Sequence, residues 1–145
     1  MIHLIAIAGY VTTHVVGIIL AIIVSFAVGF LWHGPLFGRQ WMALNNIPQP
    51  KKEDRKFSMM LPGIAANTVM VFVQSAVLGR AFQILVLPNI GYAFIIATIL
   101  WLPFTALTIV NSYAWVGKPM KLMVLDAAHY LVALYAVAAV LYATL

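Results

Sequence analysis

Long runs of hydrophobic residues alternate with short polar segments along the whole chain. A helix of about 20 apolar residues crosses the roughly 30 Å hydrocarbon core of a bilayer, so each long run predicts one membrane span. The spans are predicted at about 13–32, 57–78, 92–110 and 121–145. This pattern predicts an all-α, polytopic membrane protein, in which a bundle of four transmembrane helices forms a single membrane domain over 1–145.

Turn-forming residues set the predicted end of the first span. Gly34 and Pro35 predict that the helix ends there and that a cytoplasmic loop covers 33–56. The apolar run before this loop begins at Ile2 and is longer than one crossing. Its outer part, before about Thr13, is therefore expected to be tilted or interfacial.

The later boundaries follow from the same signals. The apolar segment 81–87 leaves two alternatives, because the second helix can continue through it or the segment can lie in the interface. Pro103 lies inside the third span and predicts a kink, which a membrane helix tolerates. A turn is predicted from Asn111 to Met120.

Composition supports a membrane location. Hydrophobic residues make up 65% of the 145 residues and charged residues only 8%, whereas a soluble domain carries about 25% charged residues. The lipid bilayer is therefore the expected surrounding of the chain. The absence of cysteine removes disulfides, thiolate metal sites and cysteine nucleophiles from consideration.

Basic residues are concentrated in the first and third loops, whereas the opposite side has only Arg80. The basic residues of the two loops are Arg39, Lys51, Lys52, Arg55, Lys56, Lys118 and Lys121. The positive-inside rule therefore predicts that these loops are cytoplasmic and that both termini lie outside. The net charge of +5 is explained by topology, and no basic stripe with interleaved aromatic residues indicates nucleic acid as a partner.

Small and polar residues share one face of each predicted helix. On the first helix, small residues recur every four positions and allow another helix to approach closely, at Gly17, Ala21, Ser25 and Gly29. The corresponding face carries Gly63, Asn67 and Gln74 on the second predicted helix and Thr98, Thr105, Thr108 and Ser112 on the third. On the fourth it carries Asp126, His129, Ala133 and Ala136. Such faces are typical of helix packing, within one bundle, with a second copy, or with a larger membrane complex.

Asp126 is the most informative polar residue, because it is the only acidic residue outside the first loop. A carboxylate within a span costs a few kcal/mol unless it is paired, hydrated or protonated, so it should face the bundle interior. His129, one helical turn further, is its expected partner. Asn111 and His33 are expected at a similar depth. These residues predict either a site that binds a polar ligand, relays protons or holds a metal, or a hydrogen-bonded network that fixes helix register.

The remaining patterns indicate neither catalysis nor a resident cofactor. His3 and His14 lie near the outer end, and a bis-histidine haem would need partners at equal depth, which His14 and His129 do not have. No Gly-rich phosphate loop, HExxH motif or nucleophile elbow is present, so no catalytic residue, metal or cofactor is assigned. The tryptophans lie near span ends and are typical of an interfacial belt, at Trp32, Trp41, Trp101 and Trp115.

One segment resembles a known family. The stretch Trp32-His33-Gly34-Pro35-Leu36-Phe37-Gly38-Arg39-Gln40-Trp41-Met42 is similar to the motif that follows the first helix in the bacterial membrane family "domain of unknown function 1761". The similarity continues at Asn111-Ser112-Tyr113, at Lys121-Leu122 and over 126–130. The resemblance covers nearly the whole chain and implies a four-helix protein with no assigned activity, for which the bacterial cytoplasmic (inner) membrane is the expected location.

Three hypotheses for function follow from these observations. The first, which the small-residue ridge of the first helix favours, is a small, non-enzymatic membrane protein that forms a homo-oligomer or serves as an accessory subunit of a larger membrane complex. The second is a transporter or channel for a small solute or protons, in which Asp126 and His129 line a cavity that faces the cytoplasm. The third is an enzyme or cofactor-binding protein that acts on a lipid or a quinone at the inner leaflet.

Overall fold

A computed structural model describes residues 2–48 and 57–145, which form helices joined by short turns and contain no strand. The elements are α1 (Ile2–Thr13), α2 (Val15–Leu31), η1 (Trp32–Leu36), α3 (Gly38–Leu44), η3 (Phe57–Met59), α4 (Leu61–Leu85), α5 (Ile90–Trp101), η4 (Leu102–Ala106), α6 (Leu107–Trp115) and α7 (Met120–Ala143). Within the described residues, four helical rods are long and apolar enough to cross a membrane, namely Val15–Leu36, Leu61–Leu85, Ile90–Trp115 and Met120–Ala143. The prediction of an all-α membrane protein with four spans is confirmed.

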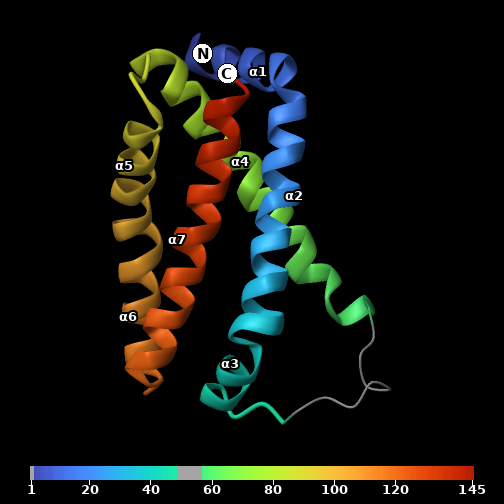
Figure 1. The fold of residues 1–145 in the computed structure, drawn as a ribbon, viewed down its shortest axis with the longest axis vertical. Helices are drawn as coiled ribbons and strands as arrows, with labels where there is room; N and C mark the ends of the chain where they lie inside the picture. Colours follow the sequence, from blue (N-terminus) through green and yellow to red (C-terminus); the bar gives the residue numbers. More distant parts are fainter. Residues whose placement is uncertain (1, 49–56) are drawn as a thin grey trace.

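The first helix, α1, lies across the end of the bundle at which both termini are found (Figure 1). We refer to this end as the terminal end and to the opposite end, which carries α3, as the loop end. The chain turns at His14, whose φ of −118° and ψ of 27° interrupt the helix. Just before it, the Thr12 and Thr13 hydroxyls donate to the Gly9 carbonyl at 2.9 and 3.0 Å. Such side-chain bonds compete with the helical ladder and favour a break there.

Two prolines within the spans occupy π-helical turns. Pro35 lies in η1 and Pro103 lies in η4. A proline has no N–H, and its ring collides with the carbonyl four residues earlier, so the wider π-turn accommodates it. In η1, the N–H of Phe37 donates to the carbonyl of Trp32 at 2.9 Å, five residues back. The kink predicted at Pro103 therefore takes the form of a π-helical turn inside a continuous rod.

Helical structure extends beyond three of the predicted boundaries. The segment 33–44, expected as loop, forms η1 and α3, because the π-turn accommodates the proline. The second span continues to Leu85, past the expected end at about 78, and stops where Val86 adopts a left-handed conformation with φ 46°. The third span continues past Asn111 to Trp115.

The small-residue ridge of α2 packs against α7 of the same chain. Ala21 is completely buried. At the terminal end, a Cβ on Gly17 would overlap the side chain of Thr144 on the segment that follows α7. Further along the ridge, a Cβ on Gly29 would lie 3.7 Å from Nε2 of His129. The ridge therefore serves close packing within one bundle.

The apolar core lies mainly in the half of the bundle nearer the termini. Buried side chains of α2, α4, α5 and α7 form one cluster there, made of Ala21, Val71, Leu78, Phe82, Ala93, Ala97, Leu134, Val137, Ala138 and Leu141. Toward the loop end, the start of α4 diverges from α2 (Figure 1). Residues of α2, η1 and the start of α4 line a cavity there.

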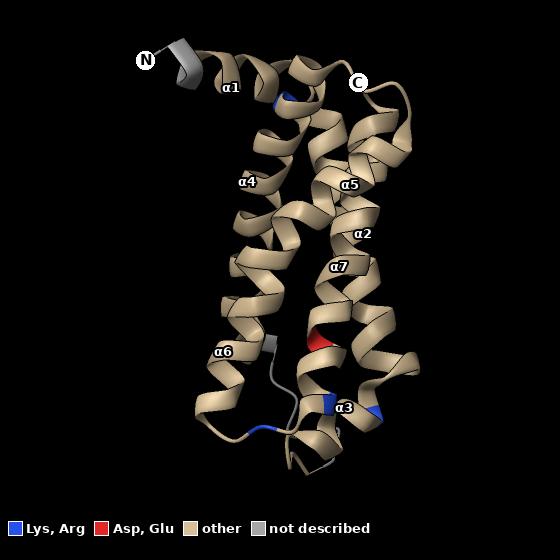
Figure 2. Ribbon diagram, turned by 90° about the vertical axis from the view of Figure 1, so that its left-hand side faces the viewer, with Lys and Arg blue, Asp and Glu red and all other residues tan. Residues whose placement is uncertain are grey.

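Charged residues of the described chain are concentrated at the loop end (Figure 2). Arg39 lies on α3, Lys118 precedes α7, and Lys121 lies in its first turn. Arg80 lies on the last part of α4, where it donates to Oε1 of Gln83 at 3.1 Å. The two ends of the bundle therefore differ in basic charge, as the positions along the sequence indicate.

Candidate functional site

The carboxylate of Asp126 joins three helices at the loop end. Asp126 lies on α7 and is only 7% exposed. One carboxylate oxygen accepts a hydrogen bond from Nε1 of Trp41 on α3 at 2.9 Å, and the other accepts one from the Tyr113 hydroxyl on α6 at 2.7 Å. These donors satisfy a charged group that would be costly inside a membrane span. We refer to Asp126, Trp41 and Tyr113 as the carboxylate brace.

The structure brings together only part of the cluster predicted from the sequence. The rings of His33 and His129 are in contact, with centroids 4.5 Å apart and planes at 71°. Asp126 accepts its hydrogen bonds from the brace residues and not from His129, although a pairing with His129 was expected. Asn111 is exposed, and its Oδ1 accepts a hydrogen bond from Nε1 of Trp115 at 3.2 Å. The polar centre is therefore a histidine pair with the carboxylate beside it.

The histidine pair supplies only two imidazoles to any metal ion. Protein metal sites such as those of zinc usually have three or four protein ligands. Nδ1 of His33 also lies 3.3 Å from the Gly29 carbonyl, within hydrogen-bonding distance. Among the described residues, no three His, Cys, Asp or Glu side chains are grouped so that they could hold a metal ion.

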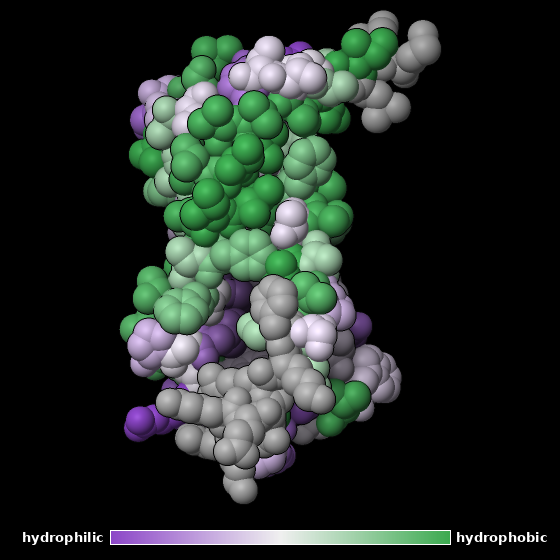
Figure 3. Space-filling model, turned by 90° about the vertical axis from the view of Figure 1, so that its right-hand side faces the viewer, coloured by the Kyte–Doolittle hydropathy of each residue, from purple (hydrophilic) through white to green (hydrophobic). Residues whose placement is uncertain are grey.

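A cavity of about 770 Å³ opens between α2, η1 and the start of α4, and we refer to it as the lateral cavity. Its apolar lining includes Phe26, Phe30, Met60 and Ile64, and its polar lining consists of Ser25, His33, Asn67 and His129. On this flank of the molecule, Figure 3 shows a hydrophobic surface toward the terminal end and a hollow with hydrophilic atoms toward the loop end. The cavity thus combines apolar walls with a polar interior.

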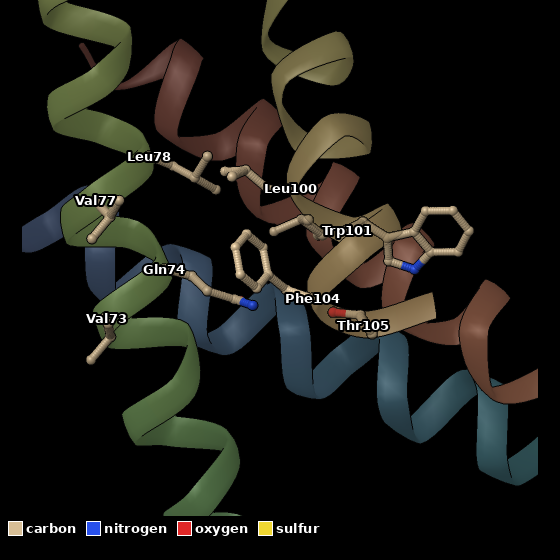
Figure 4. Close-up of a pocket in the computed structure, with 9 residues that line it drawn as sticks. Val73, Gln74, Val77, Leu78, Leu100, Trp101, Phe104 and Thr105 are labelled. Atoms are coloured by element: carbon tan, nitrogen blue, oxygen red, sulfur yellow. The ribbon is translucent and has the colours of Figure 1, made fainter. Parts of the chain in front are cut away.

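A much smaller space of about 20 Å³, the central chamber, adjoins the lateral cavity. Ser25, Asn67 and His129 line both spaces. On its other side, the chamber shares Gln74 and Thr105 with a second cavity of about 230 Å³ between α4 and the α5–η4 rod. Figure 4 shows Gln74 reaching from α4 toward Phe104 and Thr105. The three spaces therefore follow one another across the middle of the bundle.

The described lining of the lateral cavity carries no fixed charge. Among the described residues, its lining contains no Lys, Arg, Asp or Glu. Nε2 of His129 is buried and has no hydrogen-bond partner among the side chains that the structure describes. A polar atom left unpaired in an apolar interior is unfavourable by a few kcal/mol. The described part of the lining thus offers hydrogen bonding without a fixed charge.

A second polar group lies at the terminal end. The rings of Tyr10 and His14 stack with centroids 4.4 Å apart, and Nε2 of His14 lies 3.3 Å from Nε2 of Gln83 on α4. Tyr10 is 2% exposed, and its burial raises the pKa of the phenol, which therefore stays neutral at physiological pH. These contacts dock α1 on α4, and they lie on the far side of the apolar core from the histidine pair.

Two tryptophans expected in an interfacial belt instead turn inward. Trp41 donates to the carboxylate brace, and Nε1 of Trp101 donates to the Ala127 carbonyl at 2.9 Å. Trp115 is 84% exposed, as a belt residue would be. The sequence contained no local signal for the contact between Trp41 and Asp126, because helices distant in sequence bring them together. Asn67 and Gln74, in contrast, were identified by their shared helix face.

The four apolar spans and the enclosed polar residues define a polytopic membrane protein with a cavity that opens to its flank. The chain belongs to the family described as "Protein of unknown function (DUF1761)", which matches residues 16–142. The family expected from the segment 32–42 is thereby confirmed. No curated protein and no solved structure matches the chain.

Proposed function

We propose that this protein binds an amphipathic, membrane-soluble molecule in the lateral cavity. The observation that carries this proposal is the arrangement of His33, Asn67 and His129 inside a large cavity whose other walls are apolar. Ligand sites in proteins combine a mostly apolar lining with a few convergent polar groups in this way. A molecule dissolved in the bilayer can enter between α2 and α4 without leaving the lipid.

The head group of this ligand is uncharged. An anionic head would have no Lys or Arg beside it, and a cationic head would have no carboxylate, among the described lining residues. A carbonyl, hydroxyl or amide group would instead find hydrogen-bonding partners in the histidine pair and in Asn67. His33 and Asn67 supply polar side chains of this kind in the cavity wall.

A binding role is better supported than a channel. The apolar core fills the terminal half of the bundle, so a polar pathway would have to pass buried side chains such as Leu78, Phe82 and Leu141. Asp126 lines none of the three cavities and already accepts two hydrogen bonds. A transport role for Asp126 with His129 therefore lacks a continuous route in this conformation.

The proposed role is non-enzymatic. Assembly into a homo-oligomer or a larger membrane complex stays a prediction. The small-residue ridge that suggested self-association is used for packing α2 against α7. The large apolar side chains exposed on the rods are those that lipid would cover. Binding of a small amphiphile is thus the function with the most direct structural support.

Photolabelling of the protein in lipid nanodiscs tests this proposal. A long-chain alcohol that carries a diazirine supplies an uncharged head, and its crosslinks are located by mass spectrometry of peptides. We expect them to concentrate on the cavity-facing residues Phe26 and Phe30 of α2 and Ile64 of α4. Gly63→Trp should lower this labelling by about tenfold, equivalent to about 1.4 kcal/mol, because Gly63 lines the cavity and has open space beside it.

Ala65→Trp is the matched control, because Ala65 lies on the same helix, is exposed and does not line the cavity. It should leave the labelling unchanged. Two results would contradict the proposal. One is a set of crosslinks that spreads evenly over the lipid-facing residues, and the other is equal labelling of the Gly63→Trp variant and the original protein. The proposal of an uncharged head group would be contradicted if a diazirine fatty acid and a diazirine fatty amine labelled the cavity residues as strongly as the alcohol does.

We further propose that the protein lies in a bacterial cytoplasmic membrane, with the loop end in the cytoplasm and the termini outside. Because the sequence has no cysteine, single cysteines report on this orientation without a background. In intact cells, a membrane-impermeant maleimide should label Leu145→Cys, whereas Val116→Cys, in the exposed turn before α7, should react only after permeabilisation. The reverse labelling pattern would overturn the orientation.

A further inference from the structure

The central chamber is notable for the number of polar side chains that meet in so little space. Four elements contribute them, with Ser25 from α2, Asn67 and Gln74 from α4, Thr105 from η4 and His129 from α7. The volume of about 20 Å³ exceeds the 10–15 Å³ or so that one water molecule requires. The chamber is therefore large enough for a single water and too small for a larger ligand.

The direct hydrogen bonding of these side chains is incomplete. Nδ2 of Asn67 lies 3.5 Å from Oγ of Ser25, which is a long and weak contact. Nε2 of His129 is buried without a partner among the described side chains. Within a membrane span, bulk water cannot satisfy such groups, and each unsatisfied one is unfavourable. A polar molecule that bridges them removes this cost.

We propose that the central chamber binds one ordered water molecule, held by Nε2 of His129 and by the side-chain amides of Asn67 and Gln74. Buried waters typically make about three hydrogen bonds, and the chamber provides that number of partners. Ser25 and Thr105 offer further hydroxyl groups in its wall. This water site does not depend on the proposed amphiphile, because the chamber is distinct from the lateral cavity.

The bound water joins side chains that line different spaces. His129 also lines the lateral cavity, whereas Gln74 and Thr105 also line the second cavity. A water held in the chamber therefore bridges polar groups in the walls of the two larger spaces.

Radiolytic footprinting in ¹⁸O-labelled water tests the inference, because hydroxyl radicals formed from a bound water oxidise the side chains beside it. Met70 lines the chamber, whereas Met123 on α7 is buried and lines none of the three cavities. In protein held in nanodiscs, we expect Met70 to take up ¹⁸O several times faster than Met123. An equal rate at the two methionines would overturn the proposal.

Ser25→Val provides the variant control, since it replaces a hydroxyl in the chamber wall with two methyl groups. Its Met70 rate should fall to that of Met123. Ser75→Val makes the same change at a buried serine that lines none of the three cavities, and it should leave the Met70 rate unchanged. A Met70 rate unaffected by Ser25→Val would assign the oxidation to lipid-side water and contradict the inference. Should that variant fail to fold, Thr105→Val, which also removes a hydroxyl from the chamber wall, makes the same test and should likewise lower the Met70 rate.

Discussion

Replacement of Asp126 by leucine is expected to lower the free energy of unfolding by about 2–4 kcal/mol. The carboxylate accepts one hydrogen bond from Trp41 and one from Tyr113, so its removal leaves two partly buried donors without an acceptor. Each such unsatisfied donor costs about 1–3 kcal/mol, and the lower part of that range applies because both donors are only partly buried. Unfolding by sodium dodecyl sulfate, followed by circular dichroism, measures the change.

The donor variants serve as matched controls for this carboxylate brace. Trp41→Phe and Tyr113→Phe each remove one donor and should cost about 0.5–1.5 kcal/mol. Asp126→Asn keeps one acceptor oxygen and should fall between these variants and the leucine. Because the Trp41 ring also packs against His33, with centroids 5.3 Å apart, loss of the brace should also weaken photolabelling of the lateral cavity. An Asp126→Leu variant as stable as the original protein would show that the brace contributes nothing to stability.

Gly79→Ala is expected to destabilise the protein by about 1–3 kcal/mol, the usual cost of overpacking. Tyr10 of α1 is seated directly on Gly79 of α4, so that an added Cβ would overlap its ring. The tyrosine is almost completely buried and has no room to retreat without undocking α1. Unfolding by sodium dodecyl sulfate again provides the measurement, and faster proteolysis within α1 should accompany the loss.

Gly63→Ala on the same helix is the matched control, because nothing lies within 4 Å of a Cβ at that position. It should be neutral or stabilise the protein by up to about 1 kcal/mol, as alanine does in helices. The double variant Tyr10→Ala with Gly79→Ala should be no less stable than Tyr10→Ala alone, since the overlapping ring is gone. If Gly79→Ala is as stable as Gly63→Ala, the contact between α1 and α4 does not hold the two helices together.

Much of the architecture could be predicted from the sequence because it depends on local properties. The hydrophobic runs are long enough to cross a bilayer, and lipid requires helices whose backbone groups are satisfied within the segment. The four-residue recurrence of Gly17, Ala21, Ser25 and Gly29 identified a packing face before its partner was known. Similarly, Asn67 and Gln74 were expected on one face, and both line the central chamber.

Helix ends were harder to predict, because proline has different consequences in different surroundings. Pro35 and Pro103 both fall within π-helical turns, where a five-residue hydrogen bond bypasses the missing donor. The surrounding helices stabilise this local change, and a stop signal in the sequence became part of a continuous rod. The same effect converts the expected loop at 33–44 into η1 and α3.

The sequence by itself determined that the chain crosses a membrane four times and that Asp126 and His129 are enclosed by apolar segments. Only the tertiary structure decided their partners. Asp126 meets Trp41 and Tyr113, while His129 meets His33 and faces two of the cavities. The physical reason is that hydrophobic periodicity fixes which face of a helix turns inward, whereas the opposing side chains depend on how helices distant in sequence are placed.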